Sequence, residues 1–306
     1  MGTIIKKALK ILKRNIYFRK NSQFLRSGTY FFDRTSFSIM SRCDKRPKFW
    51  NKIRIFNQKE SDTNRHEKGL YSIGKYKAKF IYDDIVIFFL FDKKRYLTTK
   101  TNYDLYRDKL SYDSIEYHFF DKEARITSKV INGETHDDDV HFNKMTNLIL
   151  SQYTNDNIFE NKTINSFVDV PFFVQHGDCK NSNIIWKSNH PIIIDLEAIG
   201  PYPILYDYFY YVFMTKKDKS LEYLKSMSPI INKKFAQAGI GCPLDYYLSC
   251  YLSYLTKYLS KEYSENVVNF YLGWITYSDY SFFPLLKQNI SDVIQKAKSL
   301  GYDLDL

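Results

Sequence analysis

The chain of 306 residues contains no run of about 18 consecutive apolar residues, the length that a membrane-spanning helix requires. A transmembrane segment is therefore not expected. The apolar residues near the N-terminus are interrupted by Lys6, Lys7, Lys10 and Lys13, whereas a secretory signal peptide has an uninterrupted apolar region. Together these absences predict a cytoplasmic protein.

Cysteine is scarce, and its four positions, Cys43, Cys179, Cys242 and Cys250, form no Cys-x-x-Cys pair. No cysteine and histidine stand at the spacing of a zinc finger, so a zinc site of that kind is not expected. Unpaired thiols fit a reducing compartment. We interpret Cys179 as a small buried residue beside a loop, in preference to a nucleophile.

Acidic residues are absent from residues 1–20, which hold seven Lys or Arg. Within residues 3–18 the apolar residues recur at helical spacing and the basic residues largely fill the other face, which predicts a basic amphipathic helix. Such a helix can lie on an anionic membrane, where each cation contributes about 1 kcal/mol. The alternative is a helix packed on its own domain with a solvated basic face. Because the net charge of +11 comes largely from this segment, nucleic acid binding is not expected.

Strand patterns dominate the first third of the chain. Residues 28–57 predict strands separated by a charged turn, and residues 75–92 predict a hairpin around Asp83 and Asp84. Residues 61–73 predict a short helix between them. This order indicates a small, mostly antiparallel lobe that ends near Asp92.

Helical periodicity dominates the rest of the chain. It appears in residues 142–153 and, after Tyr206, in residues 219–227, 245–260, 264–276 and 286–299. We therefore predict an α+β fold with two lobes, a β-rich N-terminal lobe and a larger, mainly helical C-terminal lobe. The predicted domains are the N-terminal helix (1–20), the N-terminal lobe (21–92) and the C-terminal lobe (93–306).

An acidic cluster, Asp137-Asp138-Asp139, lies in the mixed, polar stretch before the first of these helices. Adjacent acids point in several directions. A solvated loop is therefore favoured here over a metal site.

Residues 174–200 contain the pattern that is most informative about chemistry. They place Asp178, Lys180 and Asn183 in one short loop, and an apolar run then leads to a second acid, Asp195. One acid can accept the proton of an attacking hydroxyl, while an amide oxygen and the other acid can hold the magnesium ion that bridges nucleotide phosphates. His-Gly-Asp with Asn five residues after the Asp, and a strand ending in Asp seventeen residues after it, is much more specific than His-Gly-Asp alone. The alternative is an Asn-rich surface turn followed by a buried strand.

The segments 176–185 and 193–197 resemble the protein-kinase-like phosphotransferases of small molecules, in particular the aminoglycoside phosphotransferase and choline kinase group. His-Gly-Asp in place of the His-Arg-Asp of eukaryotic protein kinases favours the small-molecule branch, as does Asp-x-Glu in place of Asp-Phe-Gly. Residues 206–209 are similar to a later Asp-containing motif of that group. The resemblance implies a two-lobed protein-kinase-like fold that uses ATP and Mg²⁺.

Carried over position by position, the resemblance implies roles for the loop residues. Asp178 would be the catalytic base or would orient the acceptor hydroxyl. Lys180 would contact the γ-phosphate. His176 and Asp207 would brace the loop.

The same resemblance implies the metal ligands. Asn183 and Asp195 would bind magnesium, and Glu197 would help to hold a second ion. All three offer the oxygen ligands that a hard cation prefers.

Two features depart from the pattern of the group. No glycine occurs between residues 29 and 68, so a Gly-rich loop is missing and another turn, with 41–48 as the candidate, would cover the phosphates. The strand lysine that contacts phosphate is ambiguous, because Lys52 and Arg54 share one strand face and Arg54 aligns better. Arginine and lysine are not equivalent in a tight ion pair. Glu67 is the best candidate for its partner, with Glu60 as a lesser option, and the departures leave a pseudokinase as an alternative.

The predicted function is an ATP- and Mg²⁺-dependent kinase for a hydroxyl of a small molecule or glycan. The basic helix favours a lipid-linked sugar at the inner membrane face, as in envelope polysaccharide synthesis. Choline or an amino alcohol is an alternative, for which the Tyr-rich segment 246–258 and Asp245 could form an aromatic box, although packing explains that segment equally well. A non-catalytic kinase-like binding module is the alternative from another class.

Overall fold

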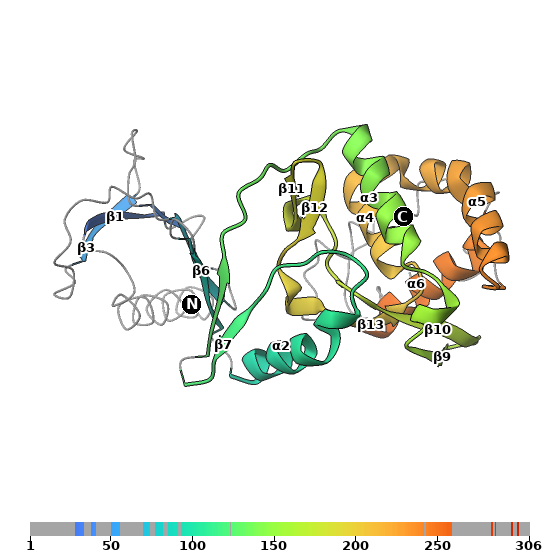
Figure 1. Cartoon of the computed structure of the whole chain (residues 1–306), viewed down its shortest axis with the longest axis horizontal. Helices are drawn as coiled ribbons and strands as arrows, with labels where there is room; N and C mark the ends of the chain where they lie inside the picture. Colours follow the sequence, from blue (N-terminus) through green and yellow to red (C-terminus); the bar gives the residue numbers. More distant parts are fainter. Residues whose placement is uncertain are drawn as a thin grey trace. The chain divides into compact units, whose positions relative to one another are not determined.

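The computed structural model describes nine ranges and four single positions of the chain: 28–33, 38–40, 50–55, 70–73, 77–81, 85–90, 93–122, 124–241, 243–258, 283, 285, 295 and 299. The chain divides into two compact units, Met1–Lys100 with Glu116–Ile131 and Thr101–Ile115 with Asn132–Leu306. The first unit is built on a sheet and the second is mainly helical, which confirms the predicted two-lobed α+β class (Figure 1). The N-terminal helix predicted over 1–20 and the helix predicted over 264–276 lie outside the described residues, as does most of 286–299.

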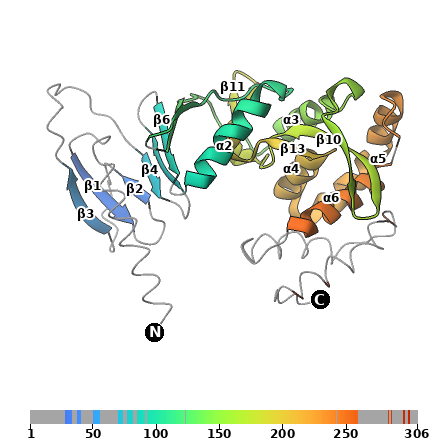
Figure 2. The same ribbon diagram turned by 90° about the horizontal axis from the view of Figure 1, so that it is seen from below.

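The first unit holds one antiparallel sheet of eight strands in the order β3-β1-β2-β4-β5-β6-β8-β7 (Figure 2). Its strands are β1 (Gly28–Asp33), β2 (Ser38–Met40), β3 (Trp50–Ile55), β4 (Leu70–Ile73), β5 (Lys77–Ile81), β6 (Ile85–Leu90), β7 (His118–Phe120) and β8 (Arg125–Lys129). The sequence of β6, IVIFFL, shows why a strand forms, because β-branched and aromatic side chains fit a pleated, buried surface.

Two sequence predictions can be compared with this sheet. The hairpin around Asp83 and Asp84 is confirmed, since β5 pairs antiparallel with β6 and Phe80 lies opposite Ile87. The helix predicted over 61–73 is wrong in its last four residues, which form β4. There Tyr71 pairs with β2 on one side and with β5 on the other. The backbone groups of β4 are therefore satisfied by sheet hydrogen bonds, although local periodicity predicted a helix.

The first unit is not continuous along the chain. Helix α2 (Lys93–Tyr106) follows β6, and β7 and β8 then return to the sheet, with β8 antiparallel to β6. This pairing explains why residues 116–131 belong to the first unit. The predicted domain boundaries, 1–20, 21–92 and 93–306, stay predictions.

The second unit combines four described helices with two small sheets (Figure 1). The helices are α3 (Asp139–Ser151), α4 (Tyr206–Lys216), α5 (Ser220–Gln237) and α6 (Leu244–Tyr258). One sheet has the order β13-β10-β9, from β13 (Gly200–Pro203), β10 (Phe167–Gln175) and β9 (Glu160–Ile164), and the other is the hairpin of β11 (Ile184–Lys187) and β12 (His190–Ile193).

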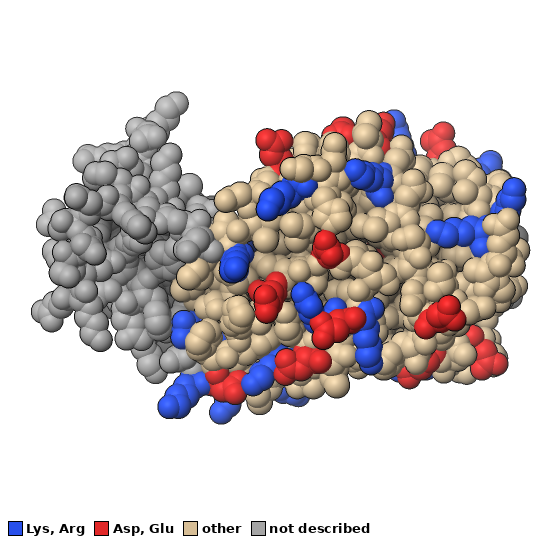
Figure 3. All heavy atoms as spheres, in the orientation of Figure 1, with Lys and Arg blue, Asp and Glu red and all other residues tan. Residues whose placement is uncertain are grey.

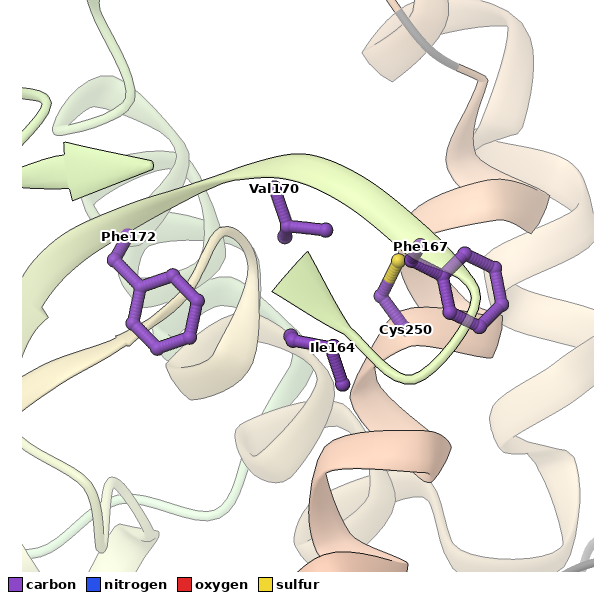
Figure 4. Packing of buried hydrophobic residues seen from close by; sticks show 5 residues of the cluster. All are labelled: Ile164, Phe167, Val170, Phe172 and Cys250. Atoms are coloured by element: carbon purple, nitrogen blue, oxygen red, sulfur yellow. The ribbon is translucent and has the colours of Figure 1, made fainter. Parts of the chain in front are cut away.

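A buried cluster joins β9 and β10 to α6. Figure 4 shows its members, Ile164, Phe167, Val170, Phe172 and Cys250, pointing toward one another from these three elements. Each fully buried Val or Phe side chain of this kind stabilises the fold by about 1.5–3 kcal/mol. The cluster fixes β10, whose last residue precedes the loop predicted to carry the chemistry.

No helix in the described part of the chain is long and apolar enough to cross a membrane. On the face drawn in Figure 3, the described Lys and Arg side chains are interspersed with Asp and Glu.

Candidate active site

A buried carboxylate holds the backbone at the start of the loop. Asp207, in the first turn of α4, accepts the N–H of His176 at 2.7 Å and the hydroxyl of Tyr112 at 2.6 Å on Oδ2. Its Oδ1 accepts the N–H of Gly177 at 2.8 Å. Burial raises the pKa of Asp207, and the three hydrogen-bond donors oppose that rise. These bonds fix the two peptide groups that precede Asp178.

A buried glutamine forms a second layer behind this carboxylate. The Gln175 Oε1 atom accepts the hydroxyl of Tyr153 at 2.7 Å and the N–H of Asp207 at 2.9 Å. Its Nε2 atom donates to the carbonyls of Tyr202 at 3.1 Å and Pro203 at 2.8 Å. All the hydrogen-bonding capacity of the amide is used, so Gln175 ties β10, β13 and the start of α4 together.

The His176 ring connects the loop to the end of β12. Its Nε2 atom lies 2.8 Å from the carbonyl oxygen of Ile194, and its Nδ1 atom lies 3.2 Å from the amide nitrogen of Asp178. A carbonyl can only accept and a peptide N–H can only donate, so the geometry selects the neutral tautomer with the proton on Nε2. The ring is fully buried. These contacts fit the bracing role that the resemblance implies for His176, which stays a prediction.

Gly177 is required by the shape of the loop. Its φ of +80° lies in the left-handed region. A Cβ atom at this position would meet the hydroxyl of Tyr202 and would lie 2.6 Å from the carbonyl oxygen of Ala198. The same hydroxyl donates to that carbonyl at 2.6 Å, so neither group can move away without loss of a hydrogen bond.

The carboxylate of Asp178 receives donors on both oxygens. Oδ1 accepts the hydroxyl of Tyr210 at 2.6 Å and Nζ of Lys180 at 2.9 Å. Oδ2 accepts Lys180 at 2.7 Å and Nδ2 of Asn183 at 3.0 Å. The side chains of Asp178 and Lys180 are 29% and 30% exposed, so solvent can reach this acid. It is oriented by three side chains, of which the lysine is the most flexible.

Asn183 is buried, and its amide orientation is determined by its partners. Nδ2 also donates to the backbone carbonyl of Asp178 at 2.9 Å. Both partners of Nδ2 are acceptors, so the amide oxygen points to the other side. The backbone carbonyl of Asn183 accepts the N–H of Ile194 at 2.9 Å, and Ile184 of β11 pairs with Ile193 of β12. The hairpin therefore brings Asn183 close in space to the residue before Asp195.

Residues 159–225 match the model of the phosphotransferase enzyme family. The match runs from β9 into α5 and includes the loop with its brace from α4. It confirms the resemblance that the His176–Asp195 motif indicates.

Solved structures of low similarity were also found. The streptomycin–ATP complex of APH(2")-IIa is 13% identical, with 74% of this chain and 90% of that chain covered and a TM-score of 0.39. A choline/ethanolamine kinase family protein from Mesorhizobium loti is 9% identical, with 75% and 88% covered and a TM-score of 0.39. Amicoumacin kinase hAmiN with AMP-PNP and Ca²⁺ is 9% identical, with 79% and 89% covered and a TM-score of 0.33. No curated protein matches the chain, and likeness at these levels says nothing about the substrate.

The described hydrogen bonds connect only some residues of the phosphotransferase motif to one another. Hydrogen bonds connect Asp178, Lys180 and Asn183 directly, as given above. Asp195 follows β12 with φ +65° and ψ +53°, and Glu197 lies in the short helix η5 (Leu196–Ala198); both are partly buried. Their roles in metal binding stay predictions.

Three residues of the first unit are predicted to take part in nucleotide binding, and these roles stay predictions as well. Lys52 and Arg54 lie on β3, where their backbones pair with Phe31 and Thr29. Because they are two residues apart on one strand, they share a face of the sheet. Glu67 lies outside the described residues.

Cys179 is fully buried within the phosphotransferase loop. Burial raises the pKa of its thiol, and the nearby carboxylates of Asp207 and Asp178 add to the rise. The thiol therefore stays protonated, which agrees with its interpretation as a buried small residue.

Sequence reasoning missed several residues that shape the site. Tyr210 lies three residues after Asp207 on α4, so helical spacing could have placed it on the same side. Tyr112 lies 95 residues from Asp207, and no local pattern marks it. Gln175 directly precedes the His-Gly-Asp motif but carries no signal that distinguishes it from an ordinary strand residue.

Proposed function

We propose that this chain is an ATP- and Mg²⁺-dependent phosphotransferase that phosphorylates a hydroxyl group of a small molecule or glycan. The observation that carries the proposal is the braced loop, in which Asp178 is held by Lys180, Asn183 and Tyr210 while Asp207 fixes the backbone before it. The family match over residues 159–225 supports the same chemistry.

Asp178 would orient the acceptor hydroxyl and accept its proton. Both of its oxygens already receive donors, so an acceptor hydroxyl must take the place of one of them. Lys180 is the donor that can leave most easily, because its side chain is long and partly exposed. A lysine that turned toward the γ-phosphate would free an oxygen of Asp178 and would also stabilise charge on the phosphoryl group.

Asn183, Asp195 and Glu197 would hold magnesium. The donor set fits this ion, since carboxylate and amide oxygens are the ligands that Mg²⁺ prefers and the Asn183 amide oxygen is turned away from the partners of its nitrogen. When bound, the magnesium–nucleotide complex supplies the phosphoryl group and neutralises its charge. The chain's own part is to position the hydroxyl and take up its proton.

The acceptor is the least constrained part of the proposal. A lipid-linked sugar at the inner membrane face depends on residues 3–18, which are outside the described part of the chain. A choline kinase would need an aromatic box, but Tyr247 and Tyr251 of α6 are buried in packing. The Asp245 carboxylate also accepts the N–H of Leu285 at 3.0 Å. These observations favour packing over a quaternary-amine site on α6.

The first experiment measures thermal stability with and without Mg-ATP. A ligand at 100 times its Kd adds about 2.7 kcal/mol to the free energy of unfolding, which such an assay detects. We expect a magnesium-dependent rise for the wild type that is lost in Asp195→Ala and retained in Asp156→Ala, an exposed control. No rise for the wild type at millimolar nucleotide would favour the non-catalytic binding module.

The second experiment separates binding from transfer. Asp178→Asn keeps the shape of the side chain and one acceptor oxygen, so it should retain the Mg-ATP stabilisation. Phosphate transfer to a panel of amino sugars, polyols and amino alcohols should fall by at least about 100-fold, because the group that accepts the proton is lost. Unchanged transfer in this variant would contradict the role of Asp178.

A further inference from the structure

Three side chains outside the loop bring metal-ligating atoms together. His136, Asp138 and His141 each offer one ligand atom, and these atoms lie within 4.8 Å of one another. The His141 Nδ1 atom is 2.7 Å from Oδ2 of Asp138, and the His136 Nδ1 atom is 3.7 Å from the same oxygen. No other such group of three or more His, Cys, Asp or Glu occurs among the residues that the structure describes.

The two imidazole rings are held in place by packing. They stack with a centroid distance of 3.8 Å and an interplanar angle of 3°. Both present an edge-to-face contact to Trp186, at 6.4 Å for His136 and 4.6 Å for His141. Backbone hydrogen bonds of 3.1 and 2.8 Å between Glu134 and Trp186 fasten this segment to β11. Packing therefore holds the two rings side by side, and because their planes are parallel, one ring must turn about χ2 for both nitrogens to face a single ion.

The two carboxylate oxygens of Asp138 have different partners. Its Oδ1 atom accepts the N–H groups of Val140 and His141 at 3.0 Å each, which caps the start of α3. Its Oδ2 atom faces the two histidines. The sequence favoured a solvated loop at this acidic cluster because adjacent acids diverge, but that argument did not include the histidines on either side.

We propose that His136, Asp138 and His141 form a site for a divalent transition-metal ion of the zinc class, separate from the proposed magnesium ligands. Imidazole nitrogens suit Zn²⁺, Ni²⁺ or Cu²⁺, whereas Mg²⁺ prefers oxygen. Ligands bonded to tetrahedral zinc at about 2.0–2.1 Å lie about 3.3 Å from one another, and the observed 2.7 and 3.7 Å bracket this distance. The ion would take the place of the hydrogen between His141 Nδ1 and Asp138 Oδ2, and the neutral His141 ring would then carry its hydrogen on Nε2.

The surroundings support this assignment. The His136 Nε2 atom lies 3.7 Å from a carboxylate oxygen of Glu134, so a small movement of the Glu134 side chain would let it accept the Nε2–H of a ligating imidazole. Water would complete the coordination. Asp137, between two of the ligands, accepts Nδ2 of Asn181 at 2.8 Å. An ion here would fasten the first turn of α3, through His141, to the N-cap Asp138 and to His136 in the segment before it, and it does not depend on the proposed transfer reaction.

Zn²⁺ titration of the full chain by calorimetry, in excess Mg²⁺, tests the proposal, and Co²⁺ absorption reports whether the ligands are nitrogen and oxygen or thiolate. We expect one ion per chain, with binding at least 10-fold weaker in His136→Gln and in Asp138→Asn. The second variant keeps the helix cap, because Asn caps as well as Asp. The control is His190→Gln, since His190 forms an exposed pair with Asp113 at 2.7 Å.

Wild-type affinity in both cluster variants would overturn the proposal, as would an equal loss of affinity in His190→Gln. A thiolate spectrum with Co²⁺ would also overturn it, because it would place the ion on cysteine. Far-UV circular dichroism and thermal unfolding without metal identify any variant that fails to fold. If one of the two cluster variants fails to fold, the zinc affinity of the other cluster variant tests the proposal.

Discussion

The carboxylate of Asp207 accepts the backbone N–H of His176 at 2.7 Å, although 31 residues separate them in the chain. This bond attaches α4 to the end of β10 at the point where the strand becomes the loop. The geometry of Asp178 therefore depends on a buried carboxyl group that does not itself reach the surface.

Asp207→Asn should lower the free energy of unfolding by about 1–3 kcal/mol. The amide of asparagine has one accepting oxygen, and its NH₂ group would face a buried donor that then lacks a partner. Urea unfolding checks this prediction. Asp169→Asn is the matched control, because Asp169 is exposed and its φ of +52° is one that Asn adopts readily. Equal stability of the two variants would contradict the role of Asp207.

The free energy of unfolding should depend on pH through Asp207. Burial raises the pKa of Asp207 in the folded state, so the folded chain retains this proton to higher pH than the unfolded chain. The stability that Asp207 contributes is then fully present below the unfolded pKa of about 3.9, and it decreases as pH rises through the raised value. The difference in unfolding free energy between wild type and Asp207→Asn should therefore shrink from pH 4 upward. A difference that grows with pH would show that the folded pKa is lowered.

Gly177→Ala should destabilise the chain and disrupt the loop. The added methyl group collides with Tyr202 and Ala198 at a φ of +80°, and a strained backbone of this kind costs about 1–3 kcal/mol before the collision is counted. Gly241→Ala is the control, since a Cβ atom there meets nothing within 4 Å. Thermal unfolding of both variants, together with phosphate transfer, measures the effect. Similar melting temperatures for the two variants would contradict the requirement for glycine at position 177.

Lys180→Met should separate activity from stability. The ion pair with Asp178 is about a third exposed, so its loss should cost less than about 1 kcal/mol of unfolding free energy. Transfer should fall at least about 10-fold if the lysine stabilises charge on the phosphoryl group. Lys162→Met removes a more exposed ion pair, with Glu160 at 2.6 Å, and should leave transfer unchanged. Equal transfer by the two variants would remove Lys180 from the proposed mechanism.

The sequence alone was sufficient to identify the loop. His176, Asp178, Asn183 and Asp195 lie close in the chain, and the apolar run before Asp195 predicts the strand that returns it to the loop. Short-range spacing encodes these features, since the chain between them is too short to adopt many arrangements.

Only the tertiary structure determined which residues from distant parts of the chain contact one another. Leu70–Ile73 became a strand because neighbours were available on both sides, and Tyr112 reached Asp207 from 95 residues away. His136 and His141 became a stacked pair because Trp186 of β11 contacts both rings. Such contacts depend on where the packed core brings distant segments together, and local periodicity carries no information about that distance.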